Sequence, residues 1–403
     1  LVYSTLAHLR KDPENDKKII SGLWGDLPKL FFNHGLSIRW IYDFTRGSLT
    51  ITPKKSHDLL NSHDNDNFQT HSLLVPTNKW KTFFKSLLFF IKYYLLFSFK
   101  LFNLKRNFSH NILLKSYYSY LKFNIKDSFF GICAIENILY SNTFDDILNS
   151  INKQDLGLFI NENQGWEFLF IKSWKKFNHG KLISIQHSTV SYWDLRYYYR
   201  EWINESLTPD FISVNGESAK NLFLKSNYPM EKLIKLESLR YNYLDNFITE
   251  SGFKKPKNIL VLGDIFRLKT LNMVRIINEI PEDENFNFIF KSHPACIISP
   301  VDLKNFQIVD KNLSELLSNF DTVICPASSG SSVEAYTLGL KTILYIEKEV
   351  NTSPLYKNSE VYNFSEKNKL LKCLNKPQRK ITSNSFFYLD KDYNLWNQLL
   401  NEL

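Results

Sequence analysis

Short apolar runs alternate with helical patterns through two long stretches of this chain, and that alternation constrains its fold more than any other feature. The elements predicted after residue 257 are strands at residues 258–262, near Phe288, near Val323 and at residues 342–345, and helices at residues 270–279, 313–318 and from Val333. A similar order runs from residue 156 to residue 224. Strands that alternate with helices are typical of parallel, doubly wound sheets. We therefore predict an α/β protein with two Rossmann-like domains that face a central cleft.

The boundary between the two domains is expected near residues 245–256. The chain has 403 residues, which suits two domains of ~100–200 residues each. A Lys-Lys-Pro-Lys run at residues 254–257 has the composition of a linker. We predict an N-terminal domain over residues 1–245, a C-terminal domain over residues 256–390 and a final helix over residues 391–403. Residues 58–68, rich in Asn, Asp and His, are predicted as a loop.

Two polar motifs follow predicted strands of the C-terminal domain. One is Lys291-Ser292-His293-Pro294, and the other runs from Ser328 to Ala335 with two serines on each side of Gly330. A turn of small residues between a strand and a helix offers hydroxyls, backbone N–H groups and the positive end of a helix dipole. A histidine at a neighbouring strand end adds a donor for the same anion. The two motifs therefore predict a phosphate site, and with it a bound nucleotide or nucleotide sugar.

These and further motifs resemble those of a known class of enzyme. The chain is similar to GT-B glycosyltransferases and, more narrowly, to a family of bacterial surface-carbohydrate biosynthesis proteins, over most of its length except about residues 50–130. The motifs that carry the resemblance, besides the two above, are Trp24-Gly25-Asp26-Leu27-Pro28, Glu162-Asn163-Gln164-Gly165-Trp166-Glu167, Gln186-His187-Ser188, Leu239-Arg240-Tyr241 and Leu262-Gly263-Asp264. The His-Pro and Ser-Ser motifs are similar to those of bacterial GT-B sialyltransferases and Kdo transferases, which use CMP-activated sugars.

The resemblance implies a donor site in the C-terminal domain and an acceptor site in the N-terminal domain. In the similar transferases the histidine and a serine pair hold the CMP phosphate, and the two serine pairs here leave that choice open. Glu334 is expected at ribose hydroxyls, and Arg240 suits either an anion contact or an exposed place at the domain junction. The residues assigned to the donor are Gly263, Asp264, Lys291, His293, Pro294, Ser328, Ser329, Ser331, Ser332, Glu334 and Arg240. Those assigned to the acceptor are Gln164, Trp166, Glu167 and Gln186.

Two residues at predicted strand ends suit general-base chemistry. A sugar transfer needs a base for the acceptor hydroxyl, unless configuration is retained, and positive charge or dipoles at the leaving phosphate. Glu162 follows the strand at residues 156–160 and His187 follows the strand at residues 182–186, so both are expected at the cleft rim. His187 also suits a sugar contact or a place in a polar loop. Glu167 fits better as an acid at a helix start, and His179 as a helix C-cap.

A basic and aromatic insertion is expected at about residues 67–126. This stretch has ten Lys or Arg and no Asp or Glu, in a chain of net charge +9. Residues 83–104 are strongly apolar, but three lysines at positions 85, 92 and 100 make them a poor bilayer span of ~20 residues. At ~100° per residue these lysines share one helix face. We predict an interfacial helix, with Phe83, Leu87, Phe90, Tyr94 and Leu101 on its apolar face, that docks on an anionic membrane. Packing of that face inside the N-terminal domain is the alternative.

The sequence thus predicts a glycosyltransferase that moves a CMP-activated nonulosonic acid or Kdo onto a growing bacterial surface glycan. It is expected in the cytoplasm, as a peripheral protein on the inner face of the plasma membrane. Cys133, Cys296, Cys325 and Cys373 form no C-x-x-C motif, which argues against a zinc site or a disulfide scaffold and fits a reducing compartment. With no D-x-D motif at a strand end, we expect no metal, and no cofactor besides the nucleotide-sugar donor.

Several alternatives stay open. A CDP-glycerol-type phosphotransferase or a nucleotide-sugar epimerase would keep the fold and change the chemistry. A nucleic-acid-binding protein would use the basic segment, since basic charge with interleaved aromatics binds single strands. The continuous apolar runs of that segment, such as residues 93–99, argue against nucleic acid as a partner. A non-catalytic glycan-binding protein is the last alternative.

Overall fold

A computed structural model describes most of the chain. The described residues are 1–12, 18–45, 52–62, 68–110, 112–191, 194–199, 204–247, 258–281, 286–347, 352–378 and 385–402, without the side chains of Ala7 and of residues 101–116. The linker predicted at residues 254–257 lies outside them.

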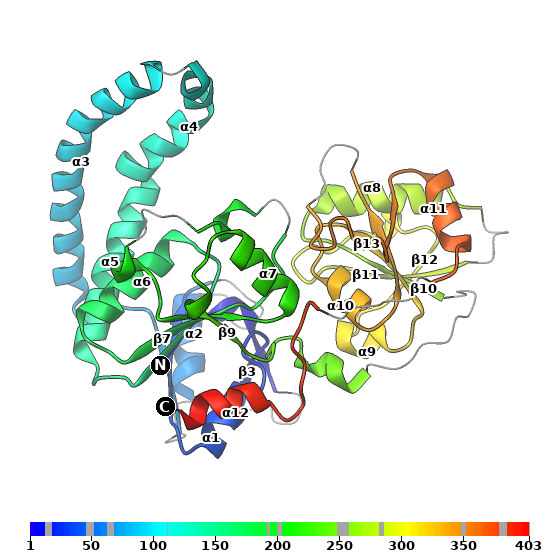
Figure 1. Ribbon diagram of the computed structural model, residues 1–403, viewed down its shortest axis with the longest axis horizontal. Helices are drawn as coiled ribbons and strands as arrows, with labels where there is room; N and C mark the ends of the chain where they lie inside the picture. The colour runs from blue at the N-terminus through cyan, green and yellow to red at the C-terminus, as the bar shows by residue number, and fades with distance from the viewer. Residues whose placement is uncertain are drawn as a thin grey trace.

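A seven-stranded parallel sheet forms the centre of the N-terminal half (Figure 1). Its order is β5-β4-β1-β6-β7-β8-β9, and every neighbouring pair is parallel. The strands are β1 Val2–Thr5, β4 Ile38–Asp43, β5 Gln69–Leu73, β6 Leu156–Ile160, β7 Lys181–Ile185, β8 Phe211–Val214 and β9 Leu233–Lys235. The order reverses between β1 and β6. Open α/β sheets bind ligands beyond the carboxyl ends of the strands at such a reversal.

Helices cover both faces of this sheet because successive strand residues point to opposite sides. Leu158 of β6 packs with Trp24 and Trp40 on one face, whereas Phe159 packs with Phe144 and Trp174 on the other. The helices of this half are α1 Leu27–Asn33, α2 Pro53–Ser62, α5 Ile132–Ser150, α6 Gly165–Lys176 and α7 Glu217–Lys225. A short antiparallel pair, β2 Leu9–Lys11 and β3 Ile19–Ser21, lies outside the sheet.

A six-stranded parallel sheet forms the C-terminal half. Its order is β12-β11-β10-β13-β14-β15. The strands are β10 Asn258–Leu262, β11 Asn287–Lys291, β12 Phe306–Ile308, β13 Thr322–Pro326, β14 Lys341–Tyr345 and β15 Tyr362–Phe364, and the helices are α8 Arg267–Asn278, α9 Leu313–Leu317, α10 Ser331–Thr337 and α11 Lys367–Asn375. This order reverses between β10 and β13, so the half has its own switch point. Both halves are doubly wound, as the alternation predicted.

The last helix, α12 Asn394–Asn401, packs on the N-terminal half (Figure 1). Its Trp396 is fully buried in the cluster that contains Trp24. The carboxylate of Glu237 accepts hydrogen bonds from the N–H groups of Leu395 at 2.7 Å and Trp396 at 3.1 Å, so a distant side chain satisfies donors that a helix start leaves free. The chain approaches α12 through residues 385–390, where Phe387 stacks on Tyr241 at 4.1 Å between ring centres.

A long helical hairpin projects from the N-terminal half (Figure 1). It consists of α3 Lys79–His110 and α4 Ile112–Phe130, and α4 leads into α5. Two predictions about this region were wrong. Residues 58–62 belong to helix α2, where fully buried Ser56 and Leu60 share one face, and residues 63–67 lie outside the described residues. The start of the expected insertion forms β5, an edge strand of the sheet.

Candidate functional site

Polar side chains follow the strands at the carboxyl edge of the N-terminal sheet. His8 ends the turn after β1, Asn161 and Glu162 follow β6, and His187 lies two residues after β7. β1 and β6 are the strands between which the order reverses. The residues therefore meet where this fold class binds ligands.

Glu162 and His187 lie side by side at this edge. Nε2 of His187 is 3.4 Å from Oε1 of Glu162, with 11% and 32% of the two side chains exposed. Burial, with the positive charges of Arg240, His8 and Arg196, lowers the pKa of His187 to about 3. The imidazole is therefore neutral at pH 7 and a weak base. Glu162 is the more exposed of the pair, and the imidazole of His187 lies beside its carboxylate.

The loop that carries Glu162 is held by the first turn of α6. Oε1 of Glu167 accepts hydrogen bonds from the N–H groups of Glu162 at 2.9 Å and Gln164 at 2.8 Å. Asn163 adopts φ +54°, a left-handed conformation that Asn tolerates better than most residues. Burial raises the pKa of Glu167 to about 8, although the hydrogen bonds from these backbone N–H groups act to lower it. Glu167 thus lies at the helix start, as its alternative role predicted. The Gln164 amide donates a hydrogen bond to Oε2 of Glu162.

Of the other two residues assigned to the acceptor, Gln186 is buried and Trp166 is half-buried. The Trp166 ring packs on Tyr3 at 5.0 Å between ring centres. Gln186 is buried, and its amide bonds at both ends, accepting from the N–H of Asn215 at 3.2 Å and donating to the Ser188 carbonyl at 2.9 Å. These contacts give Gln186 a role in the fold, so we withdraw it as an acceptor contact, whereas an acceptor contact by Trp166 stays a prediction.

His179 was predicted as a helix C-cap, but it lies two residues beyond the C-cap of α6. The C-cap of α6 is Phe177. Nδ1 of His179 accepts a hydrogen bond from the N–H of Gln154 at 3.1 Å, and Nε2 lies 3.0 Å from the Leu148 carbonyl. The ring thereby joins α5 to the turn before β7.

At the carboxyl edge of the C-terminal sheet, Asp264 and Ser328 face each other across the reversal between β10 and β13. The Ser328 hydroxyl donates to Oδ2 of Asp264 at 2.8 Å, and Oδ1 accepts from the N–H of Phe266 at 2.9 Å. Lys269 lies 3.2 Å from the same hydroxyl. A Cβ on Gly263 would come within 3.2 Å of the His293 N atom. Glycine therefore lets the end of β10 approach the His-Pro turn closely.

The four serines of the second motif have different surroundings. Ser332 is fully buried and donates to the Ser329 carbonyl at 2.7 Å. The backbone N–H groups of Ser329, Ser332 and Val333 bond within the turn, so the turn offers fewer free N–H groups than the sequence predicted. Ser328 is bound to Asp264. For Ser329 and Ser331 the structure gives no side-chain hydrogen bond among the described residues, which makes this pair the better candidate for an anion.

His293 presents one ring nitrogen as a donor. Nδ1 accepts the N–H of Ala295 at 3.1 Å, and burial, the largest effect, lowers the pKa of His293. In the neutral ring the proton therefore sits on Nε2. A hollow of about 410 Å³ lies beside this histidine, lined in part by Lys291, Pro294 and Lys311. Its volume falls within the usual range of small-molecule sites, ~300–1,000 Å³.

Arg240 lies between the two edges. Its charge contributes to the lowered pKa of His187 and His8 on the N-terminal side and of His293 on the C-terminal side. The guanidinium packs over the Tyr241 ring at 5.3 Å. Within the described part of the chain it makes no ion pair with a carboxylate. A half-buried cation in this position is suited to an anionic ligand.

The neighbours of Arg240 on both sides fix its position. Gly25, with φ +44°, lies so close to Leu239 that a Cβ would be 2.6 Å from the Leu239 carbonyl oxygen. Three residues beyond Arg240, the Tyr243 hydroxyl donates to the buried Glu334. Burial raises the pKa of Glu334. A ribose contact by Glu334 stays a prediction.

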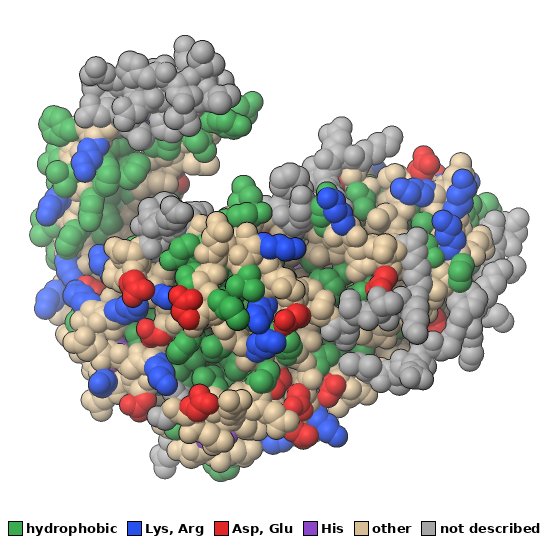
Figure 2. All heavy atoms as spheres, in the orientation of Figure 1, with side chains coloured by type: hydrophobic (Ala, Val, Ile, Leu, Met, Phe, Trp, Pro, Cys, Tyr) green, Lys and Arg blue, Asp and Glu red, His purple; other side chains and the backbone are tan. Residues whose placement is uncertain are grey.

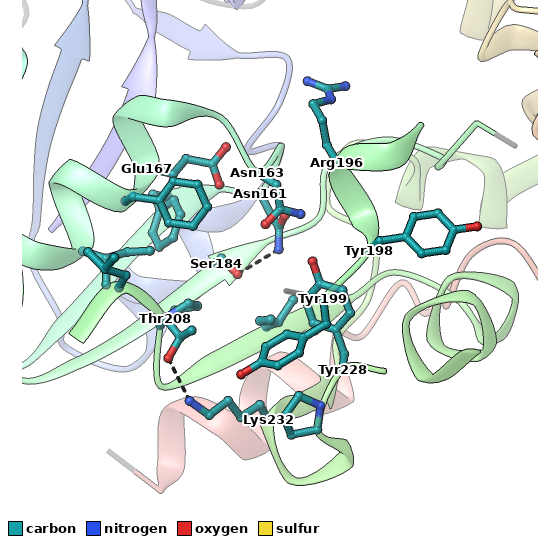
Figure 3. A pocket seen from close by; sticks show the side chains of 17 residues that line it. Asn161, Asn163, Glu167, Ser184, Arg196, Tyr198, Tyr199, Thr208, Tyr228 and Lys232 are labelled. Atoms are coloured by element: carbon teal, nitrogen blue, oxygen red, sulfur yellow. Dashed lines mark hydrogen bonds between the residues drawn. The ribbon is translucent and has the colours of Figure 1, made fainter. Parts of the chain in front are cut away.

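A small cavity of about 40 Å³ lies beside Glu162, between α6 and residues 194–209 (Figure 3). Asn161 and Asn163 line it, and neither Oδ1 of Asn161 nor Nδ2 of Asn163 has a partner in the described structure. The Nδ2 of Asn161 donates to the Ser184 hydroxyl at 3.0 Å. We had not predicted these asparagines or His8. They lie one to three residues after a strand, as Glu162 and His187 do, and Asn163 also belongs to the motif that begins at Glu162.

Among the described residues, no group of three His, Cys, Asp or Glu side chains is arranged to hold a metal ion.

Comparison with known proteins establishes the fold. No family model matches the chain, and no curated protein matches it. A Listeria monocytogenes protein assigned as a UDP-N-acetylglucosamine 2-epimerase is similar in structure with a TM-score of 0.52 and 11% identity, over 99% of this chain and 94% of that chain. The UDP-GlcNAc 2-epimerase of Methanocaldococcus jannaschii gives 0.49 and 13% identity, over 100% and 99%. At such identities the likeness to the Listeria protein shows a GT-B-like fold with two Rossmann-like domains, which confirms the predicted fold class.

Proposed function

We propose that this chain is a GT-B glycosyltransferase that binds a nucleotide-activated sugar between its two sheets and passes the sugar to an acceptor hydroxyl. The donor is a CMP-activated nonulosonic acid or Kdo, and the acceptor is a growing bacterial surface glycan. Arg240 carries the proposal, because this cation, without a carboxylate partner in the described chain, lies between the Glu162–His187 pair and the His293 turn. A transferase needs positive charge where the leaving phosphate gains charge.

The donor phosphate is proposed to lie at the C-terminal edge. The Nε2–H of His293, the hydroxyls of Ser329 and Ser331, and Arg240 are its donors. Hydrogen bonds from such groups to a charged oxygen are among the stronger ones in proteins. Both oxygens of Asp264 accept hydrogen bonds from the protein, so its carboxylate is held in place at this edge.

Glu162 is proposed as the base for the acceptor hydroxyl. Its carboxylate is partly exposed, whereas His187 is nearly buried and neutral. The imidazole N–H and the Gln164 amide hold the carboxylate in place, so the acceptor proton is transferred to a pre-oriented oxygen. Of the acceptor residues named from the sequence, Gln164 keeps a place at this rim.

A nucleotide screen and product analysis test the proposal together. A ligand at ~100 times its dissociation constant adds ~2.7 kcal/mol of stability, so thermal shifts rank the nucleotides. We expect CMP or CDP to stabilise the protein more than UMP, GMP or AMP. Equal shifts for all nucleotides would remove the cytidine assignment, and product formed only from CDP-glycerol would indicate the phosphotransferase.

A nucleotide-sugar epimerase is the second candidate. The Listeria protein that matches nearly the whole chain is assigned as a UDP-N-acetylglucosamine 2-epimerase, and Glu162 could equally remove a proton from carbon. The two reactions differ in their need for an acceptor. Deuterium incorporation from heavy water into UDP-GlcNAc without any acceptor would support the epimerase and count against the transferase.

A further inference from the structure

The projecting hairpin is attached to the body along one face of α3. Thr82 and Ser86 are buried on this face, and the Ser86 hydroxyl accepts a hydrogen bond from Asn142 of α5 at 2.9 Å. Farther along, the Phe97 ring lies 4.2 Å from that of Phe129. The rest of the described surface of α3 faces outward.

An apolar stripe runs along the outward side of α3. Its residues recur every three or four positions and therefore share one helix face. They are Trp80, Phe84, Leu88, Ile91, Leu95 and Phe99, and all are exposed, from 48% for Ile91 to 80% for Phe99. This stripe lies beside the face expected from the sequence, where Phe83 and Leu87 are exposed, Phe90 is half-buried and Tyr94 packs on Phe130 at 5.0 Å.

A lysine stripe lies beside the apolar stripe. Lys81, Lys85, Lys92 and Lys100 each directly follow an apolar-stripe residue, so they lie ~100° further round the helix, and all four are exposed. Residues 79–100 contain no Asp or Glu. Figure 2 shows hydrophobic side chains with interspersed basic ones over much of the hairpin below its tip.

We propose that the apolar and lysine stripes together dock the hairpin on the surface of an anionic lipid bilayer. A partner that fits both stripes must present an apolar region next to a negatively charged one. An anionic bilayer does so, because its acyl chains lie directly beneath its phosphates. Soluble monomers rarely expose an apolar surface this long. The docking is independent of the reaction proposed above and holds for any activity of the body.

The lysines indicate a helix that lies along the membrane. An 18-residue stretch within Lys79–Lys100 has a mean hydropathy of 1.3, and only 11% of it is buried, so by length and composition this helix could span a bilayer. A crossing helix would place Lys85 and Lys92 in hydrocarbon, which is unfavourable. A helix in the plane of the interface lets their side chains reach the phosphates while the apolar stripe enters the acyl region.

Vesicle co-sedimentation of the whole chain tests the docking. We expect binding to phosphatidylglycerol vesicles at low salt, much weaker binding at high salt, and little to phosphatidylcholine. The triple variant Lys81→Glu, Lys85→Glu and Lys92→Glu should bind at least tenfold less. Its control carries the same charge change on exposed lysines elsewhere, Lys225→Glu, Lys369→Glu and Lys372→Glu, and should bind much better than the stripe variant.

The apolar stripe is tested separately. Trp80→Ser, Leu88→Ser and Leu95→Ser together should abolish sedimentation, whereas serines at the exposed Met230, Val301 and Ile308 should not. Brominated acyl chains should quench part of the tryptophan fluorescence in the native chain and less in Trp80→Phe. Binding unchanged in both stripe variants would overturn the proposal. So would a stripe variant that stays folded and only dissociates a dimer, which would make this face an interface between two copies.

Discussion

The carboxyl edges of the two sheets have similar architecture and different chemistry. The N-terminal edge presents a partly exposed carboxylate, Glu162, beside a neutral imidazole. The C-terminal edge presents donors, His293 and two serine hydroxyls, while its own carboxylate, Asp264, is already bonded. In the proposed reaction the two sheets divide the work, with proton acceptance on one side and anion binding on the other. Variants at each edge should therefore fail in different ways.

The largest expected effect is that of Glu162→Gln at the N-terminal edge. Removing a general base should lower turnover by ~10²–10⁴ and leave nucleotide affinity nearly unchanged. Steady-state rates and calorimetric titration with the nucleotide measure the two quantities. Glu231→Gln, at an exposed glutamate, is the control. Near-normal turnover of Glu162→Gln would move the base to His187, and His187→Ala would then decide.

Arg240→Ala should affect both sides of the comparison, because Arg240 lies between the edges. We expect nucleotide affinity to fall by ~1.5–3 kcal/mol and turnover of the bound donor to fall as well. Arg275→Ala, at an exposed arginine of α8, serves as the control. A change in turnover without any change in affinity would separate Arg240 from the donor phosphate.

His293→Ala tests the C-terminal edge alone. A single donor to a charged phosphate oxygen contributes ~1.5–3 kcal/mol, so nucleotide affinity should drop while the turnover of saturated enzyme changes little. The same titration and rate measurement show it. If the nucleotide affinity is unchanged, the role of His293 is structural, namely to stabilise the turn through its hydrogen bond with Ala295.

The smallest effect on activity is expected at Glu167, which is tested through the pH dependence of stability. Burial raises its pKa from 4.5 to about 8, so the folded state favours the protonated carboxyl. That contribution is fully present below about pH 4.5 and is lost as the pH rises through about 8, on the order of a few kcal/mol. Melting temperatures from acid to mildly alkaline pH should therefore decline more for the native chain than for Glu167→Gln. Parallel curves would show that Glu167 is ionised in the folded protein.

The sequence predicted the central strands well and the edge strands poorly. Parallel strands buried on both faces appear as continuous apolar runs, which is why β6 and β10 were predicted at their observed bounds. Edge strand β5, Gln-Thr-His-Ser-Leu, has no such run. The outward face of α3 was misplaced for a related reason. Apolar residues occur on most of its surface, so only the contacts with α4 and α5 decide which face is covered.

The candidate site was predicted by position and not by contact. Glu162, His187 and His293 were found because each follows a strand, a place that local sequence shows. The inward turn of Gln186 and the bond between Ser328 and Asp264 depend on partners 29 and 64 residues away, which no local pattern shows. The same holds for the capping of α12 by Glu237.

The chain passes between the two halves twice, because Leu239 and Tyr393 pack in the N-terminal core whereas Tyr241 and Phe387 pack in the C-terminal core. Two domains that are connected at two points rotate about the line that joins these tethers. Both tethers converge near Tyr241, on which Phe387 stacks, so the expected axis of opening passes beside Arg240. Glu162 and Ser331 would then separate and approach as the two halves open and close, while Arg240 moves least and stays in reach of both edges.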